Sequence, residues 1–220
     1  MKAPEQNVRD YAYELAYRIA CEQLAGLDDI EQQCLNSGAQ YKATQKSIYI
    51  DHLNRTYRIH LPDGDVTLVK RDETVPIRDK ILILHYFLRA KGTPLSGKTI
   101  TYKELPDGIN YYPTFFKRAI HPIVSNFGSE PDRLLDTAQM LGGHKSDYGD
   151  AAVTIDAFNR VPITPVLWQG SEEFAPEGNI LFDSTISDYL PTEDITILCE
   201  VIAWKLVRIL KNGGDKSGNR

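Results

Sequence analysis

Hydrophobic residues near the amino-terminal end of the chain recur at helical spacing. Over residues 5–24 most of them fall three to five positions apart, which places their side chains along one face of an α-helix. The stripe consists of Val8, Tyr11, Ala12, Leu15, Ile19 and Leu24. The pattern predicts a helix over residues 5–24 that buries this stripe.

The period then changes to that of a β-strand. β-Branched and aromatic residues dominate 47–50, 56–61 and 66–69, and turn residues separate these runs at 52–54 and 62–65. Short runs of this composition, joined by tight turns, are typical of antiparallel strands. We therefore expect a β-meander in this part of the chain.

Residues 77–90 are hydrophobic nearly all round, and a helix without a polar face is a buried helix. Thr74 is its expected N-cap, Pro76 suits its first turn and Gly92 ends it. This helix is expected at the centre of the fold.

Further along, helices are expected over residues 114–127 and 131–141. Pro122 should break or kink the first of them, because proline lacks the N–H that a helix interior needs. Strand character returns between residues 150 and 168.

The chain ends with a strong helical pattern over residues 193–210. Thr192 is its expected N-cap, and Glu193 and Asp194 suit the positive end of the helix dipole. The expected buried stripe consists of Ile195, Leu198, Ile202, Leu206 and Ile209.

These elements predict an α+β fold with central antiparallel strands, flanking helices and a long C-terminal helix. No internal repeat or low-complexity linker divides the chain. We expect a single domain over residues 1–210 and a flexible tail over residues 211–220.

Composition adds limits on partners and location. With 42% hydrophobic and 25% charged residues, the chain has the composition of an ordinary globular protein. Its net charge is -5 and its longest basic stretches are pairs such as Lys70-Arg71, which argues against a nucleic-acid partner. The apolar run 81–88 is too short to span a bilayer, and the chain opens with polar residues rather than a secretory signal. We expect a cytoplasmic protein with no membrane partner.

Cysteine and histidine residues form no metal-binding motif. No CxxC pair occurs among the cysteines, which are Cys21, Cys34 and Cys199, so we expect buried free thiols. The histidines include no HxH or HExxH pair. His144 lies in a glycine-rich setting that a ligand can approach.

Residues 92–99 match the nucleotide-binding pattern GxxxxGK[ST]. A genuine P-loop needs a helix that begins at the lysine, because that helix and the loop N–H groups hold the phosphates. Here the residues after Thr99 are β-branched and aromatic, and Pro106 and Gly108 interrupt them. We predict that the segment connects the buried helix to a strand and that ATP does not bind.

The most distinctive stretch covers residues 162–194, PITPVLWQGSEEFAPEGNILFDSTISDYLPTED. It resembles an uncharacterised bacterial and archaeal domain family of unknown function. Members share a strand ending in Leu-Trp-x-Gly, an acidic pair before Phe, a Leu-Phe-Asp, and a Tyr-Leu-Pro-x-Glu-Asp that opens the last helix. The resemblance extends to Gly97 and residues 101–106, 141–143 and 149–150, and so covers most of the chain.

Some relatives in that family carry a cysteine-rich segment similar to an iron–sulfur module of corrinoid enzymes, which implies a link to anaerobic cofactor metabolism. This sequence has no such segment, and it has Ser171 where the resemblance leads us to expect a third acidic residue. The cofactor therefore stays unknown.

Three interpretations of the signature are open. Its aromatic residues can pack in the core while its acids serve turns and the surface. They can instead form the walls of a ligand pocket in which the acids orient the ligand. The acids can also form a hard-metal or acid–base site. The candidate ligand-binding residues are His144, Asp150, Trp168, Glu172, Glu173, Asp183 and Tyr189.

We expect any site where the 149–150 turn meets the strand end at 168–174 and the segment 181–183, since glycines there leave the backbone open to a partner. The leading hypothesis is a ligand-binding or accessory protein with a small-molecule or protein partner, linked to anaerobic corrinoid or iron–sulfur metabolism. The alternative is a metal-assisted or nucleotide-hydrolysing enzyme, without an assigned catalytic residue.

Overall fold

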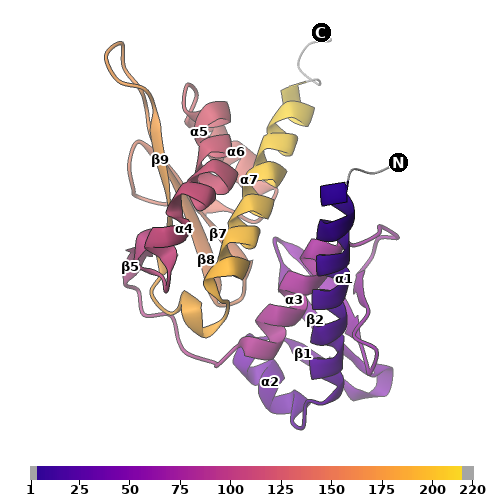
Figure 1. Cartoon of the computed structure of the whole chain (residues 1–220). Coiled ribbons are helices and arrows are strands. Elements are labelled where there is room, and N and C mark those ends of the chain that lie inside the picture. Colours follow the sequence, from indigo (N-terminus) through magenta and orange to yellow (C-terminus); the bar gives the residue numbers. More distant parts are fainter. Residues whose placement is uncertain (1–3, 215–220) are drawn as a thin grey trace. The chain divides into compact units, whose positions relative to one another are not determined.

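The computed structural model describes residues 4–214 and contains two antiparallel β-sheets with helices (Figure 1). The chain divides into two compact units. The first is Met1–Pro94 with Asp188–Leu190, and the second is Leu95–Ser187 with Pro191–Arg220. The predicted α+β class is confirmed, including the long C-terminal helix. The single domain predicted over residues 1–210 stays a prediction.

The first unit holds the predicted meander as a four-stranded sheet of order β1-β2-β3-β4. The strands are β1 (Gln40–Lys42), β2 (Ser47–His52), β3 (Arg55–His60) and β4 (Val66–Leu68). Between β2 and β3, Leu53 and Asn54 have φ angles of 49° and 60°. Positive φ at both central residues is the geometry of a two-residue hairpin turn, whose twist matches that of the strands.

Helix α1 (Pro4–Ala25) has the predicted extent but buries a different face. Tyr11 and Ile19 of the predicted stripe are 65% and 43% exposed. Leu24 is buried as predicted, but the other buried residue is Ala20, which is not part of the stripe; the side chain of Val8 lies outside the described residues. The predicted stripe is therefore correct at Leu24 and wrong at Tyr11 and Ile19.

The reason lies in helix α3 (Ile77–Arg89), which packs against α1. It presents two cations to α1: Lys80 lies 5.5 Å from the ring centroid of Tyr17, and Arg78 lies 5.9 Å from that of Tyr13. Cation–π contacts favour an amphipathic tyrosine over a purely apolar side chain at such positions, and hydrophobicity alone does not predict that choice.

The predicted burial of α3 is confirmed, since Leu82, Ile83, Leu84 and Phe87 have no exposed surface. Its predicted cap is wrong. Pro76 occupies the N-cap position in an extended conformation, with no side chain capping the helix, so Thr74 lies too far from the helix start. An unpredicted helix, α2 (Ile30–Ser37), is capped by the Asp29 carboxylate, which accepts from the Gln32 N–H.

The second unit holds a five-stranded antiparallel sheet of order β5-β9-β8-β7-β6. The strands are β5 (Thr99–Thr101), β6 (His144–Lys145), β7 (Ala151–Phe158), β8 (Val161–Trp168) and β9 (Glu177–Asp183). The sequence pattern missed β9. Residues 92–99 lead from α3 to β5, so the predicted connection from a buried helix to a strand is confirmed.

Helices cover one face of this sheet (Figure 1). They are α4 (Gly108–Phe115), a π-helical turn (Phe116–Ile120), α5 (His121–Phe127), α6 (Asp132–Gln139) and α7 (Thr192–Gly214). The π turn ends at Ile120, two residues before Pro122, and widening the helix there is one way to accommodate a proline without a donor. None of the helices within residues 4–214 has the length and hydropathy of a membrane span.

Alternate strand residues face these helices and form the core of the second unit. They include Val153, Ile155, Ile163, Leu167, Ile180 and Phe182, all buried. Strand alternation places threonines on the other face, among them Thr99, Thr154 and Thr164.

Helix α7 buries the predicted stripe at Ile195, Leu198, Ile202 and Leu206, while Ile209 is half-buried. The predicted N-cap is wrong, because Thr192 is the first helical residue and its hydroxyl donates to the Pro106 carbonyl instead. The helix continues through residues 211–214, and the rest of the predicted tail lies outside the described residues.

Candidate functional site

The connection between β8 and β9, residues 169–176, projects from the second unit as a hairpin and is called the acidic loop here. In Figure 1 it is the orange loop at the upper left, which extends beyond the end of α5. Its sequence, QGSEEFAP, contains the acidic pair and the phenylalanine of the signature.

Ser171 determines the conformation of the acidic loop. Its hydroxyl accepts from the N–H groups of Glu173 and Phe174 at 3.3 and 3.2 Å, and its own N–H donates to the Phe174 carbonyl at 2.8 Å. Short polar side chains stabilise turns by such bonds to their own backbone, and a carboxylate can accept them equally well. The serine therefore fulfils a role that an acid at this position would also fulfil.

Asp150 holds the base of the acidic loop. Its carboxylate accepts from the Gln169 N–H at 2.8 Å, and its N–H donates to the Leu167 carbonyl at 2.9 Å. The 149–150 turn and the end of β8 thus meet, as the sequence led us to expect. Trp168, at this end of β8, is 43% exposed.

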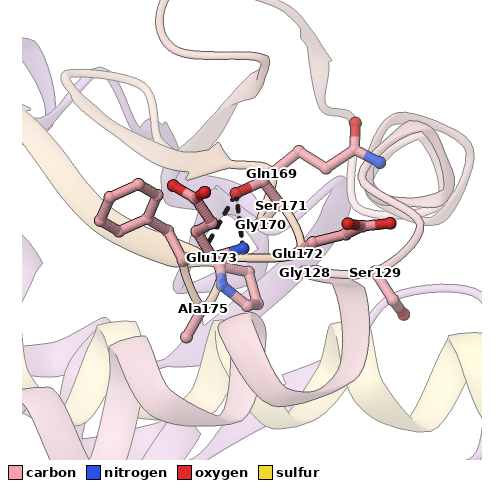
Figure 2. A pocket seen from close by; sticks show the side chains of 10 residues that line it. Gly128, Ser129, Gln169, Gly170, Ser171, Glu172, Glu173 and Ala175 are labelled. Atoms are coloured by element: carbon pink, nitrogen blue, oxygen red, sulfur yellow. Dashed lines mark hydrogen bonds between the residues drawn. The ribbon is translucent and has the colours of Figure 1, made fainter.

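A cavity of about 450 Å³ lies between the acidic loop and the end of α5. Gly128 and Ser129 line it on the α5 side, and all eight residues of the acidic loop line it on the other. Figure 2 shows Glu172 extending towards the side where Ser129 lies and Glu173 extending to the other side of the loop.

Both glutamates are exposed, and neither carboxylate makes a hydrogen bond or ion pair with another described residue. Phe174 is 72% exposed. Two carboxylates and an aromatic ring thus stand at the surface with no partner from the described part of the chain. Such a combination can bind a group that is both cationic and partly apolar.

The glycines around the acidic loop serve its own packing. A β-carbon on Gly170 would lie 2.8 Å from both the Phe174 carbonyl and Pro176, and one on Gly128 would lie 2.7 Å from Pro176. Gly149 has a φ of +55° and would place a β-carbon 2.6 Å from the Leu167 carbonyl. These positions are already in contact with the chain's own atoms, so they do not leave the backbone open to a partner.

Asp183 lies apart from the acidic loop. Trp168 pairs with Glu177 at one end of β9, whereas Asp183 pairs with Thr99 at the other end. The length of β9 separates them by about 20 Å, at about 3.3 Å per residue. The expected meeting of the acidic loop with segment 181–183 is therefore wrong, because β9 is a strand that carries the two apart.

The Asp183 carboxylate organises residues 95–98. Oδ1 accepts from the N–H and hydroxyl of Ser96 and of Thr185, and Oδ2 accepts from the Gly97 N–H at 2.8 Å. Burial alone would raise the pKa of Asp183, but the bonds from Thr185 and Ser96 outweigh it and lower the pKa to about 2. The carboxylate is ionised at neutral pH.

These bonds also explain the P-loop-like segment. The N–H groups of Ser96 and Gly97, which would hold phosphate in a nucleotide site, are bonded to an internal carboxylate. Lys98 is followed by strand β5 rather than by a helix. The segment lacks both features that phosphate binding requires.

Tyr189 and His144 lie elsewhere. Tyr189 belongs to the first unit, where it is fully buried, stacks on Tyr86 with centroids 5.8 Å apart and donates to the Thr93 carbonyl. His144 is exposed on β6, opposite Thr154. The structure thus brings Asp150, Trp168, Glu172 and Glu173 to one end of the second sheet, and places Asp183, His144 and Tyr189 away from it.

No three His, Cys, Asp or Glu side chains gather closely enough to hold a metal ion anywhere in residues 4–214. Sequence reasoning missed Gly128 and Ser129 as parts of the cavity. Both lie at least 40 positions before the acidic loop, with no motif to connect them to it.

The family model for a domain of unknown function (DUF3786) matches residues 29–205, which is more than half of the chain. The chain belongs to this family. The resemblance seen in the signature is thereby confirmed. No curated protein and no solved structure matches the chain.

Proposed function

We propose that this DUF3786 protein is a binding or accessory protein whose acidic loop docks onto a basic surface of a partner protein. The observation that carries the proposal is the exposed group Glu172, Glu173 and Phe174, in which neither carboxylate has a bond to a described residue. An aromatic anchor among charged residues is a common composition of the strongest contacts in protein interfaces.

Two features favour a protein over a small molecule. The two glutamates extend to different sides of the acidic loop (Figure 2), so a single small ligand would not contact both carboxylates closely. The loop is also held in shape by Ser171 and Asp150. A loop that is ordered before binding loses less conformational entropy when it docks.

The enzyme alternative receives less support. Asp183 and the Gly97 N–H satisfy each other, and Asp183 is far along the strand from Asp150, Glu172 and Glu173. The proposed connection to anaerobic corrinoid or iron–sulfur metabolism rests on the family resemblance alone. In this chain Cys21, Cys34 and Cys199 lie in three different helices.

A photo-crosslinking experiment tests the docking proposal. p-Benzoylphenylalanine placed at Phe174 keeps an aromatic group at the exposed position. In cells that express the chain, irradiation should yield a covalent adduct, and mass spectrometry should locate the crosslink beside Lys or Arg residues of the partner. Attractive charge pairs act in the encounter and the complex, so E172Q/E173Q should reduce the adduct about tenfold.

Two controls make the result specific. The same crosslinker at Met140, which is 67% exposed at the C-cap of α6, should not form this adduct. The double substitution E14Q/D136N removes the same number of charges from exposed acids outside the acidic loop and should leave the yield unchanged. An adduct that forms equally well with E172Q/E173Q, or no adduct at position 174, overturns the proposal.

A further inference from the structure

A second cavity, of about 170 Å³, lies on the face of the five-stranded sheet opposite the helices. It is called the hydroxyl pocket here. Its principal lining residues are Thr99, Tyr148, Thr154, Thr164, Leu181 and Asp183. They come from the strands β5, β7, β8 and β9 and from the connection between β6 and β7. None of them belongs to the acidic loop, so this site is independent of the docking proposal.

Tyr148 closes one side of the hydroxyl pocket. It lies on the connection between β6 and β7, at one edge of the sheet, and its hydroxyl is bonded to that of Thr99 on β5, the strand at the other edge. The O–O distance is 3.0 Å. Tyr148 therefore reaches across the sheet, and the pocket lies between its side chain and the strands.

The hydroxyl groups of the pocket belong to two hydrogen-bonded chains, the first of which begins at Ser146, a residue that does not line the pocket. Ser146 is bonded to Thr154 at 2.6 Å, and Thr154 is bonded to Thr164 at 2.8 Å. Each hydroxyl has one hydrogen and two lone pairs. The two bonds among Ser146, Thr154 and Thr164 use two of their three hydroxyl hydrogens. The bond between Thr99 and Tyr148 uses one of their two hydroxyl hydrogens. Each chain thus retains one O–H donor together with unused acceptor positions.

Asp183 supplies a negatively charged hydrogen-bond acceptor, whereas the hydroxyl groups are neutral and can donate. Its Oδ1 already accepts four hydrogen bonds, so both of its lone pairs are fully used, whereas Oδ2 accepts only that of Gly97 and keeps one lone pair for a further donor. The pKa of about 2 keeps this group negatively charged. Anionic ligands would be repelled. An ammonium ion has only donors and would leave the remaining O–H groups unmatched.

The size and the hydrogen-bonding groups together define the ligand class. A water molecule occupies about 30 Å³ of liquid, so the cavity has room for about six non-hydrogen atoms, the size of a three-carbon polyol. We infer that the hydroxyl pocket binds a short-chain polyol, with one ligand hydroxyl donating to Asp183 Oδ2 and other ligand oxygens accepting from the threonine and tyrosine hydroxyls.

NMR titration with glycerol and erythritol tests this inference. Saturable shifts are expected for the backbone amides of Gly97, Tyr148, Thr154 and Thr164, without comparable shifts in the first unit. Tyr148→Phe and Thr164→Val each remove one hydroxyl while nearly keeping the side-chain volume. Each should weaken binding about tenfold, the usual effect of one lost hydrogen bond.

The controls are Tyr111→Phe and Thr114→Val, which remove exposed hydroxyls from α4 and should bind as the unchanged chain does. Spectra of all variants without ligand establish that they fold alike. If Thr164→Val misfolds, Tyr148→Phe at the exposed side of the pocket carries the test. Shifts that never saturate, that are equal in all variants, or that appear only with methylammonium or inorganic phosphate overturn the inference.

Discussion

At the scale of single residues, Asp183 shows that an acidic residue within a sequence signature need not belong to a site. Its sequence neighbours suggest a member of an acidic site, yet the carboxylate accepts five hydrogen bonds from residues 96, 97 and 185. A carboxylate with this many donors stabilises structure, because charge-assisted bonds are stronger than neutral ones. The residue joins the end of β9 to the segment before β5.

Asp183→Asn should therefore lower the free energy of unfolding at neutral pH by about 1–2 kcal/mol, allowing for its partial exposure. Asn removes the negative charge. Its NH₂ group would also face an N–H or O–H group that now donates to the carboxylate, so two donors would meet. Urea unfolding measures the change. Asp136→Asn, at an exposed position on α6, is the matched control, and an equal effect of both substitutions would contradict the role given to Asp183.

The pH dependence gives a second test of Asp183. Its pKa is lowered to about 2 in the folded chain, against about 4 for an unperturbed Asp. The stabilisation is therefore complete above about pH 4 and is lost as the pH falls towards 2. Between these values the chain should lose more stability than the Asp183→Asn variant does. Urea unfolding at each pH measures the two stabilities. If the unchanged chain and the Asp183→Asn variant lose stability in parallel, the role given to the Asp183 carboxylate is wrong.

At the scale of elements, the acidic loop depends on one hydroxyl. Ser171 binds two backbone N–H groups, and the hairpin strands on either side supply its fixed ends. Because the carboxylates of Glu172 and Glu173 make no bond to a described residue, the loop's conformation comes from its turn and its base rather than from its charged groups.

Ser171→Ala should loosen the acidic loop and Ser171→Asp should preserve it, since a carboxylate can replace the hydroxyl as acceptor. Limited proteolysis with a glutamate-specific protease measures this at Glu172 and Glu173, because cleavage follows local opening. The alanine variant should be cut several-fold faster. Ser129→Ala, on the other side of the cavity, is the control. Equal rates for all variants would show that Ser171 does not hold the loop.

At the scale of the whole molecule, the chain passes from the first unit to the second, returns at Asp188–Leu190, and leaves again for α7. The returning segment contributes to the first unit through Tyr189, which stacks on Tyr86, and through Asp188, which binds Lys91 and Thr93. Unfolding the first unit would release the residues directly before α7. We expect the two units to unfold together for this reason.

Two buried thiols report on that cooperativity. Cys34 lies in the first unit and Cys199 in the second. Burial raises the pKa of both, to about 11 for Cys34, so neither should react with a thiol reagent before its unit opens. Pulsed labelling across a urea series should modify both at the same midpoint. Separate midpoints would contradict the predicted single domain.

The sequence by itself determined the types of most elements. Alternation over residues 47–61, the all-apolar helix α3 and the stripe of α7 follow from short-range periodicity, which depends only on neighbouring residues. The β-branched residues after Thr99 likewise excluded a P-loop helix. The signature was enough to place the chain in its family. These conclusions need no knowledge of which element packs against which.

Only the tertiary structure decided which of these residues share a site. The buried face of α1 depended on Arg78 and Lys80 of another helix, and Asp183 found donors at Ser96, 87 positions earlier. Tyr189 joined the core of the first unit, away from the signature around it. Contacts between distant positions follow from side-chain shape, hydrogen bonding and strand register. Periodicity carries no information on these, so the acidic loop and the hydroxyl pocket emerge only from the folded chain.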